Sequence, residues 1–214
     1  MTTRSPADSI VRQETPPRLA VPRLAALTLV PVVLAVAGLF HPHHLTQDTA
    51  GRWIALHLLL LPLFPLLAGS PLLLLRGLTG RWATTARVGC LVYAVFYTSL
   101  DAIAGVAYGT MVATADDPVA LSRTGPALDV VGGTLGFIGA AGFLLASVAT
   151  TKALAARYGG RRVATGGTIL IAASVVWLGS HIYWPEGVIT VLAIGSGFAL
   201  LCIATGGPVM ARSR

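Results

Sequence analysis

Charged residues are scarce in this sequence. Only 11% of its 214 residues are Asp, Glu, Lys or Arg, whereas 55% are hydrophobic and the mean hydropathy is +0.77. Soluble globular proteins carry about 25% charged residues. The few charges lie in short intervals between long apolar runs, which is typical of a multi-pass membrane protein and excludes an ordinary soluble domain.

Basic clusters are also lacking, and cysteines are few. The net charge is +7, but the arginines are dispersed through short polar segments without interleaved aromatic residues, so we expect no nucleic-acid partner. Lys152 is the only lysine, and the bias toward Arg, Ala, Gly, Leu and Val indicates a GC-rich bacterial genome. The two cysteines, Cys90 and Cys202, are expected at depths that differ by about 10 Å, too far for a disulfide, so both are predicted to be free thiols.

Recognised catalytic motifs are missing as well. The sequence contains no HExxH, GxSxG, P-loop or CxxC motif. The glycine pairs near residues 132–142 follow no predicted strand and therefore make no dinucleotide-binding fingerprint. These absences favour a protein that is not an enzyme, although scattered His and Asp residues in membrane helices leave a membrane hydrolase open.

What is present is a set of six long apolar runs, which predicts an all-α bundle of six transmembrane helices. The expected spans are 24–40, 54–75, 86–113, 127–150, 163–184 and 188–210, within a membrane domain of residues 23–210. Residues 1–22 are expected to be a disordered tail and 211–214 a short second tail. The small-residue run Ala35-Val36-Ala37 resembles a signal-peptidase site, but the apolar run continues through Phe40, which favours a retained helix over a cleaved signal peptide.

The distribution of basic residues predicts the orientation of these spans. An even number of spans places both termini on one side. Of the fifteen Lys and Arg residues, only Arg52 and Arg123 fall in the loops on the opposite side. The positive-inside rule therefore places the N- and C-termini, with both tails, in the cytoplasm of a bacterial plasma membrane.

Two spans have compositions that suggest special packing. The span 54–75 contains Pro62, Pro65 and Pro71, which should kink it. The span 127–150 is rich in glycine, which lets helix backbones approach closely. The segment 41–53 is too polar to lie in lipid and is expected to be a connector between spans, and the segment 115–126 is expected to form a polar loop.

The span 86–113 carries a single carboxylate near its middle, Asp101. Burying an Asp at the bilayer centre costs roughly 2.5–3.5 kcal/mol on insertion scales, so this residue should face protein or water. Tyr93, Tyr97, Asp101 and Gly105 recur every four residues and predict a polar stripe along one helix face. A proton or ion relay and a structural hydrogen-bonding role are both open for Asp101.

All five histidines fall on the side opposite the basic turns. His57 and His181 are expected at similar depths, about 10 Å outside the midplane by the helical rise. Ser174, Trp177, His181 and Trp184 are spaced as one face of the fifth span. These positions predict an outward-facing ligand or proton pocket formed by Asp101, Tyr97, Tyr108, His57, His181 and Trp177.

The same histidines can be interpreted as a metal or haem site. His57 and His181 would supply two ligands, and Asp129, His41, His43 or His44 a third. Their spacing matches no specific metal signature, and histidines also suit the membrane interface because their rings are apolar with a polar tip. The interfacial interpretation is therefore preferred, and haem or a transition metal is the alternative.

The function favoured by the sequence is binding or transport of a small ligand, ion or proton through the outward-facing pocket. The first alternative is a haem- or metal-binding redox protein that uses the outer histidines. The second is an accessory subunit of a larger membrane complex, in which the glycine-rich span binds a partner helix or another copy of the chain. The lipid bilayer is the one partner that all three share.

Overall fold

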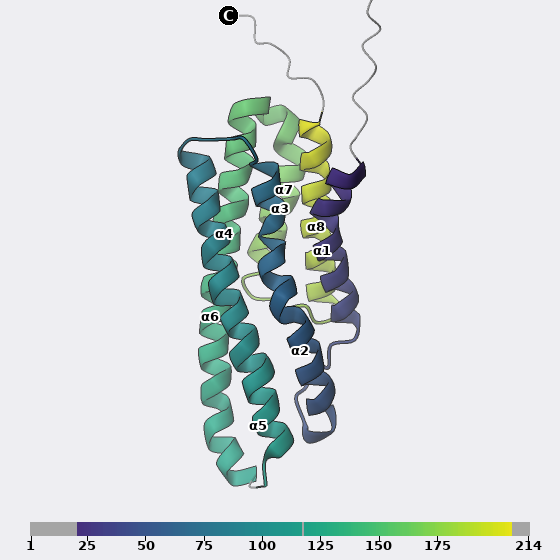
Figure 1. Cartoon of the computed structure of the whole chain (residues 1–214), viewed down its shortest axis with the longest axis vertical. Helices are drawn as coiled ribbons and strands as arrows, with labels where there is room; N and C mark the ends of the chain where they lie inside the picture. Colours follow the sequence, from purple (N-terminus) through teal and green to yellow (C-terminus); the bar gives the residue numbers. More distant parts are fainter. Residues whose placement is uncertain (1–20, 117, 207–214) are drawn as a thin grey trace, which may run out of the picture.

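The computed structural model describes residues 21–116 and 118–206, and the ordered elements in this part of the chain are helices connected by short loops (Figure 1). They are α1 (Val21–Leu39), α2 (Gln47–Leu67), α3 (Gly69–Leu74), α4 (Arg81–Leu100), the π-helix η1 (Asp101–Ala107), α5 (Tyr108–Thr114), α6 (Pro118–Tyr158), α7 (Gly160–Val176) and α8 (Glu186–Thr205). The tails predicted at 1–22 and 211–214 lie outside the described residues, except that Val21 and Pro22 begin α1.

Five helical segments in the described chain are long and apolar enough to cross a membrane. They are Val21–Leu39, Gln47–Leu74, Arg81–Thr114, Leu121–Tyr158 and Glu186–Thr205. The remaining helix, α7, has 17 residues and is about 26 Å long, somewhat less than the hydrocarbon thickness of about 30 Å. Large apolar side chains such as Leu29, Leu91 and Ile189 are exposed on the outside of the bundle, where lipid would cover them. The predicted all-α architecture of several apolar helices is confirmed.

Close packing between α4 and α6 depends on the glycines of α6. A Cβ atom at Gly139 would lie 2.7 Å from the backbone nitrogen of Tyr97, and one at Gly142 would lie 2.9 Å from that of Tyr93. Real Cβ contacts are never this short, so the two backbones can approach only because these positions are glycine. The small residues thus hold together two helices of this chain.

The expected loops at 41–53 and 115–126 are largely helical, which corrects the sequence prediction. α2 begins at Gln47, where Thr46 and Thr49 form a reciprocal capping box, and α6 begins at Pro118 and continues through Pro126 to Tyr158. The prediction relied on hydropathy, which marks where a helix leaves lipid. A helix can continue past that level because water tolerates its polar side chains.

The fifth expected span is also corrected. α7 ends at Val176, and its last turn tightens through hydrogen bonds from Leu178 N to Val175 O (3.1 Å) and from Gly179 N to Val176 O (3.2 Å). Residues 177–185 form a loop, so the helical face predicted to carry Trp177, His181 and Trp184 is wrong. Non-helical backbone within the depth expected for a membrane span is tolerated where it is buried in protein or lines a cavity.

The helices differ in length, which creates a recess at one end of the bundle. α6 has 41 residues and α1 has 19, about 61 Å and 28 Å long. Figure 1 shows the described ends of α1 and α8 together at the top, while the α7–α8 loop lies well above the tip formed by α5 and α6 at the bottom. The α1–α2 connector and the α7–α8 loop therefore meet beside walls built by longer helices.

Candidate metal and ligand site

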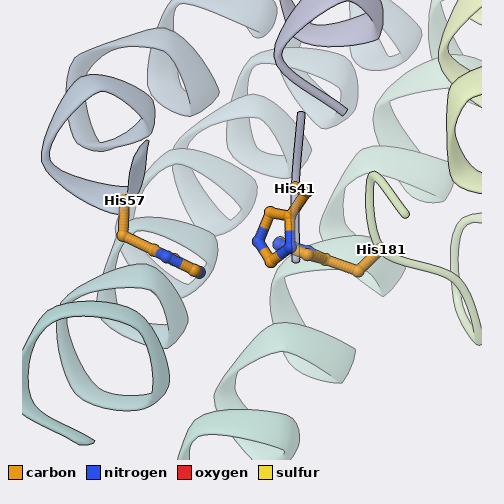
Figure 2. A group of neighbouring side chains, drawn as sticks. All are labelled: His41, His57 and His181. Atoms are coloured by element: carbon orange, nitrogen blue, oxygen red, sulfur yellow. The ribbon is translucent and has the colours of Figure 1, made fainter. Parts of the chain in front are cut away.

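Three histidines from three separate segments converge in this recess. His41 lies in the α1–α2 connector, His57 on α2, and His181 in the α7–α8 loop. One ring nitrogen from each lies within 4.8 Å of those of the other two. Figure 2 shows the three side chains directed toward one another. The side chains of His41 and His57 are buried. We call these residues the histidine triad.

The Nδ1 atom of each ring in the histidine triad has a hydrogen-bond partner. The Nδ1 of His57 lies 2.7 Å from the carbonyl oxygen of Trp53, and that of His41 lies 2.8 Å from the carbonyl oxygen of Pro42. The Nδ1 of His181 lies 3.0 Å from the hydroxyl of Tyr97. A carbonyl oxygen only accepts, so Nδ1 donates in His41 and His57, and in their neutral rings Nε2 holds the free lone pair. Metal-ligating histidines usually show this arrangement.

Asp101 adds a buried carboxylate next to the histidine triad. It is the first residue of η1 and is only 1% exposed. Its Oδ1 lies 3.8 Å from the Nε2 of His57, beyond hydrogen-bonding distance, and within the described part of the chain neither carboxylate oxygen has a hydrogen-bond partner. A buried carboxylate with no partner is costly, so its position requires a compensating interaction.

The π-helical turn η1 fixes the position of His57. The indole Nε1 of Trp53 donates a 3.1 Å hydrogen bond to the carbonyl oxygen of Gly105 in the middle of η1. A side chain at Gly105 would overlap the ring of His57, which lies directly against the backbone there. π-helical turns occur often at functional sites, and this one brings a helix backbone into contact with an imidazole.

Aromatic rings hold the histidine triad on the remaining sides. The ring of His41 makes edge contacts with those of Trp53 and Tyr183, with centroid distances of 4.9 and 4.4 Å, and the ring of His57 stacks on Trp53 at 4.8 Å. Burial lowers the pKa of His41 from 6.5 to about 4, and burial also holds the pKa of His181 well below its ordinary value. Both imidazoles are therefore neutral at pH 7, the form that binds metal ions.

A cavity of about 850 Å³ lies beside the histidine triad. The six residues predicted to form a pocket, Asp101, Tyr97, Tyr108, His57, His181 and Trp177, all line it. The other predicted metal ligands occupy different places. His43, His44 and Asp129 are exposed at the cavity wall and do not join the histidine triad, whereas His41 does. The structure thus brings together three of the six candidate ligands.

Sequence reasoning missed Trp53 and Tyr183 as parts of the site. Trp53 falls at the end of the polar segment 41–53, to which no site residue except the histidines was assigned, and Tyr183 was given no role. Its position two residues after His181 gave no periodic signal, because the surrounding loop is irregular. The weak indication in the sequence was the concentration of aromatic residues at 177–184.

No family model matches the chain, and no curated protein or solved structure shows significant similarity to it. The function must therefore be inferred from the geometry of the site.

Proposed function

We propose that the chain is a multi-pass protein of a bacterial plasma membrane whose outward-facing pocket binds a transition-metal ion at His41, His57 and His181. The distribution of basic residues supports this orientation, with both termini in the cytoplasm. Among the described residues, Arg52 and Arg123 are the only Lys or Arg at the end of the bundle where the histidine triad lies.

The convergence of three imidazoles from three segments is the observation that carries this proposal. Zinc–nitrogen bonds of about 2.0–2.1 Å in tetrahedral geometry place the ligand nitrogens about 3.3 Å apart. The triad's nitrogens already lie within 4.8 Å of one another, so ring movements of about 1 Å would complete the site. Three imidazoles suit zinc, copper, nickel, cobalt or iron(II), and they leave a further coordination position toward the cavity.

The buried carboxylate of Asp101 supports a cationic ligand. Three neutral imidazoles supply no negative charge, and a divalent ion in a low-dielectric site needs a counter-charge. Asp101 lies 3.8 Å from the Nε2 of His57 and has no other described partner, so a bound cation would satisfy both groups. The cost of burying this carboxylate is explained if an ion occupies the site.

The geometry favours a bare ion over haem. Two axial histidines must lie on opposite faces of a porphyrin, which fills the plane between them. Here the centroids of the three rings form a triangle with sides of 5.0, 5.6 and 6.2 Å, so the ring of His41 occupies the space beside the line from His57 to His181, where a porphyrin would have to lie. A porphyrin cannot enter between rings in such close contact without displacing His41.

We propose that the protein in this conformation binds the ion and does not transport it across the membrane. Tyr97 and Trp177 line the cavity, and the neighbouring side chains of Phe64, Tyr93 and Phe143, which do not line it, are completely buried in the core. Passage of an ion to the other side would require these rings to separate. A role as an accessory subunit remains compatible with ion binding.

Metal analysis of the detergent-purified protein tests this proposal. After dialysis against Zn²⁺ or Co²⁺, we expect one ion per chain, and the visible spectrum of tetrahedral Co²⁺ should report imidazole ligation. His57→Ala or His41→Ala should abolish binding, while His44→Ala, which changes an exposed histidine outside the triad, should retain it. Asp101→Asn should still insert and should weaken binding. Full metal content in both His57→Ala and His41→Ala would refute the site.

A further inference from the structure

The two cavities beside the histidine triad are lined by charges of opposite sign. The 850 Å³ cavity is lined by three carboxylates, Asp101, Asp129 and Glu186, and no Lys or Arg is among its described lining residues. A second cavity of about 530 Å³, which contacts His41, is lined by Arg52 and by no described carboxylate. His43, His44 and Trp184 line both cavities, so the carboxylates and Arg52 are what distinguish them electrostatically.

Two of the acidic residues come from different helices and share the cavity with an aromatic ring that contacts the histidine triad. Asp129 on α6, Asp101 on η1 and the ring of Tyr183 all line the larger cavity. The ring centroid of Tyr183 is 4.4 Å from that of His41 and 5.3 Å from that of His181. The acidic cavity therefore extends to the triad itself.

The carboxylates also differ in exposure along the cavity. Glu186 and Asp129 are exposed, whereas Asp101 is buried, lines the same cavity and has no hydrogen-bond partner among the described residues. Neither Asp129 nor Glu186 forms an ion pair with a described Lys or Arg, so their charges are not neutralised locally. A cation that approaches through this cavity would meet the exposed Asp129 and Glu186 first, and then the buried Asp101 next to three imidazoles.

We propose that the acidic cavity is the access path for a hydrated divalent cation, and that Asp129 and Glu186 attract this ion toward the histidine triad. This inference rests on the proposed metal site, and it adds that the ion arrives as a free hydrated cation. Clefts lined by one sign of charge raise the local concentration and the association rate of oppositely charged ligands. Anionic metal complexes would be repelled, and the Arg52-lined cavity is unsuitable for a divalent cation.

Stopped-flow binding of Co²⁺ to the full chain in neutral detergent tests the path. Quenching of tryptophan fluorescence reports association, because Trp53 stacks on His57. The double variant Asp129→Asn/Glu186→Gln should associate about three- to tenfold more slowly at low ionic strength. The difference should nearly vanish in about 0.5 M salt, where the charges are screened. At saturating Co²⁺ the double variant should still bind one ion per chain.

Two further variants act as controls. Asp48→Asn removes an exposed carboxylate of α2 that lines neither cavity, and it should change the rate less than twofold. Arg52→Gln tests the alternative route. If Arg52→Gln accelerates association as strongly as the double variant slows it, the second cavity is the path and the inference is wrong. The inference is also wrong if the double variant associates at the wild-type rate at low ionic strength. Failure of the wild type to bind Co²⁺ would defeat the proposed metal site along with the path.

Discussion

The most specific consequence of the site's geometry concerns Gly105, which has no part in binding and yet controls the position of His57. A Cβ atom at residue 105 would lie 2.8 Å from the Cβ of His57 and would overlap the imidazole ring itself. Non-bonded carbon atoms prefer separations of about 3.5–4.0 Å. In Gly105→Ala, the ring of His57 must therefore move by about 1 Å or more, or η1 must separate from α2.

The movement should be large compared with what a metal site tolerates. Ligand distances in such sites hold to within about 0.2 Å. We expect Gly105→Ala to weaken Zn²⁺ binding at least 10- to 100-fold, the range seen when groups that orient a ligand are changed. Overpacking should also reduce the free energy of unfolding by about 1–3 kcal/mol. The hydrogen bond from Trp53 Nε1 to the Gly105 carbonyl (3.1 Å) should weaken for the same reason.

Competition with a chromophoric chelator would measure the affinity, and thermal unfolding in detergent would measure the stability. Gly133→Ala is the matched control, because Gly133 lines the same cavity and a Cβ there would contact nothing within 4 Å. We expect wild-type affinity from the control. If Gly105→Ala binds Zn²⁺ as tightly as the control, His57 is not the ligand that the geometry indicates.

Three other predictions follow from contacts within and around the bundle. Burial lowers the pKa of His41 from 6.5 to about 4, so the unfolded chain takes up a proton at this residue at a higher pH than the folded protein does. The free energy of unfolding of the metal-free protein should therefore be highest above pH 6.5 and should fall by up to about 3 kcal/mol between pH 6.5 and 4. Thermal unfolding of His41→Gln across this range should show a smaller loss, and an identical pH profile would contradict the burial argument. Ser174→Ala removes the 2.9 Å hydrogen bond between α7 and Ser147 of α6 and should cost about 0.5–1 kcal/mol in unfolding measurements, while an unchanged midpoint would show that the bond contributes nothing. Gly139→Ala should force α6 away from the backbone of Tyr97 and cost about 1–3 kcal/mol by the same assay, and a stability like that of Gly133→Ala would refute the close approach.

The helical architecture could be predicted because hydrophobic length is a direct physical requirement. A run such as 188–210 must be helical to satisfy its backbone in lipid, and α8 occupies most of it. The helix ends could not be predicted in the same way. Hydropathy does not indicate how far α6 extends beyond its apolar part. For α2, the capping box formed by Thr46 and Thr49 marks the start of the helix better than the polarity of residues 41–53 does.

The candidate site was partly predictable for a similar reason. The stripe of Tyr93, Tyr97, Asp101 and Gly105 was readable from helical periodicity, and all four residues are buried. His41 and His181 lie in non-helical segments, where periodicity gives no positions, so their meeting with His57 could not be derived. The expected match in depth between His57 and His181 assumed a helix at 181 that does not exist.

The use of non-helical backbone for two of the three histidines explains why the site lies where it does. The connector and the α7–α8 loop are held in part through the site itself: the Nδ1 of His41 donates to the carbonyl oxygen of Pro42, and the Nδ1 of His181 is hydrogen-bonded to the hydroxyl of Tyr97 on α4. The same bonds orient the ring nitrogens toward one another. Because His41 lies in the connector and His181 in the α7–α8 loop, a bound ion should stabilise these two segments together. Occupation of the site should therefore slow amide hydrogen exchange in residues 40–46 and 177–185 at the same time, whereas protection of only one segment would show that the two are held independently.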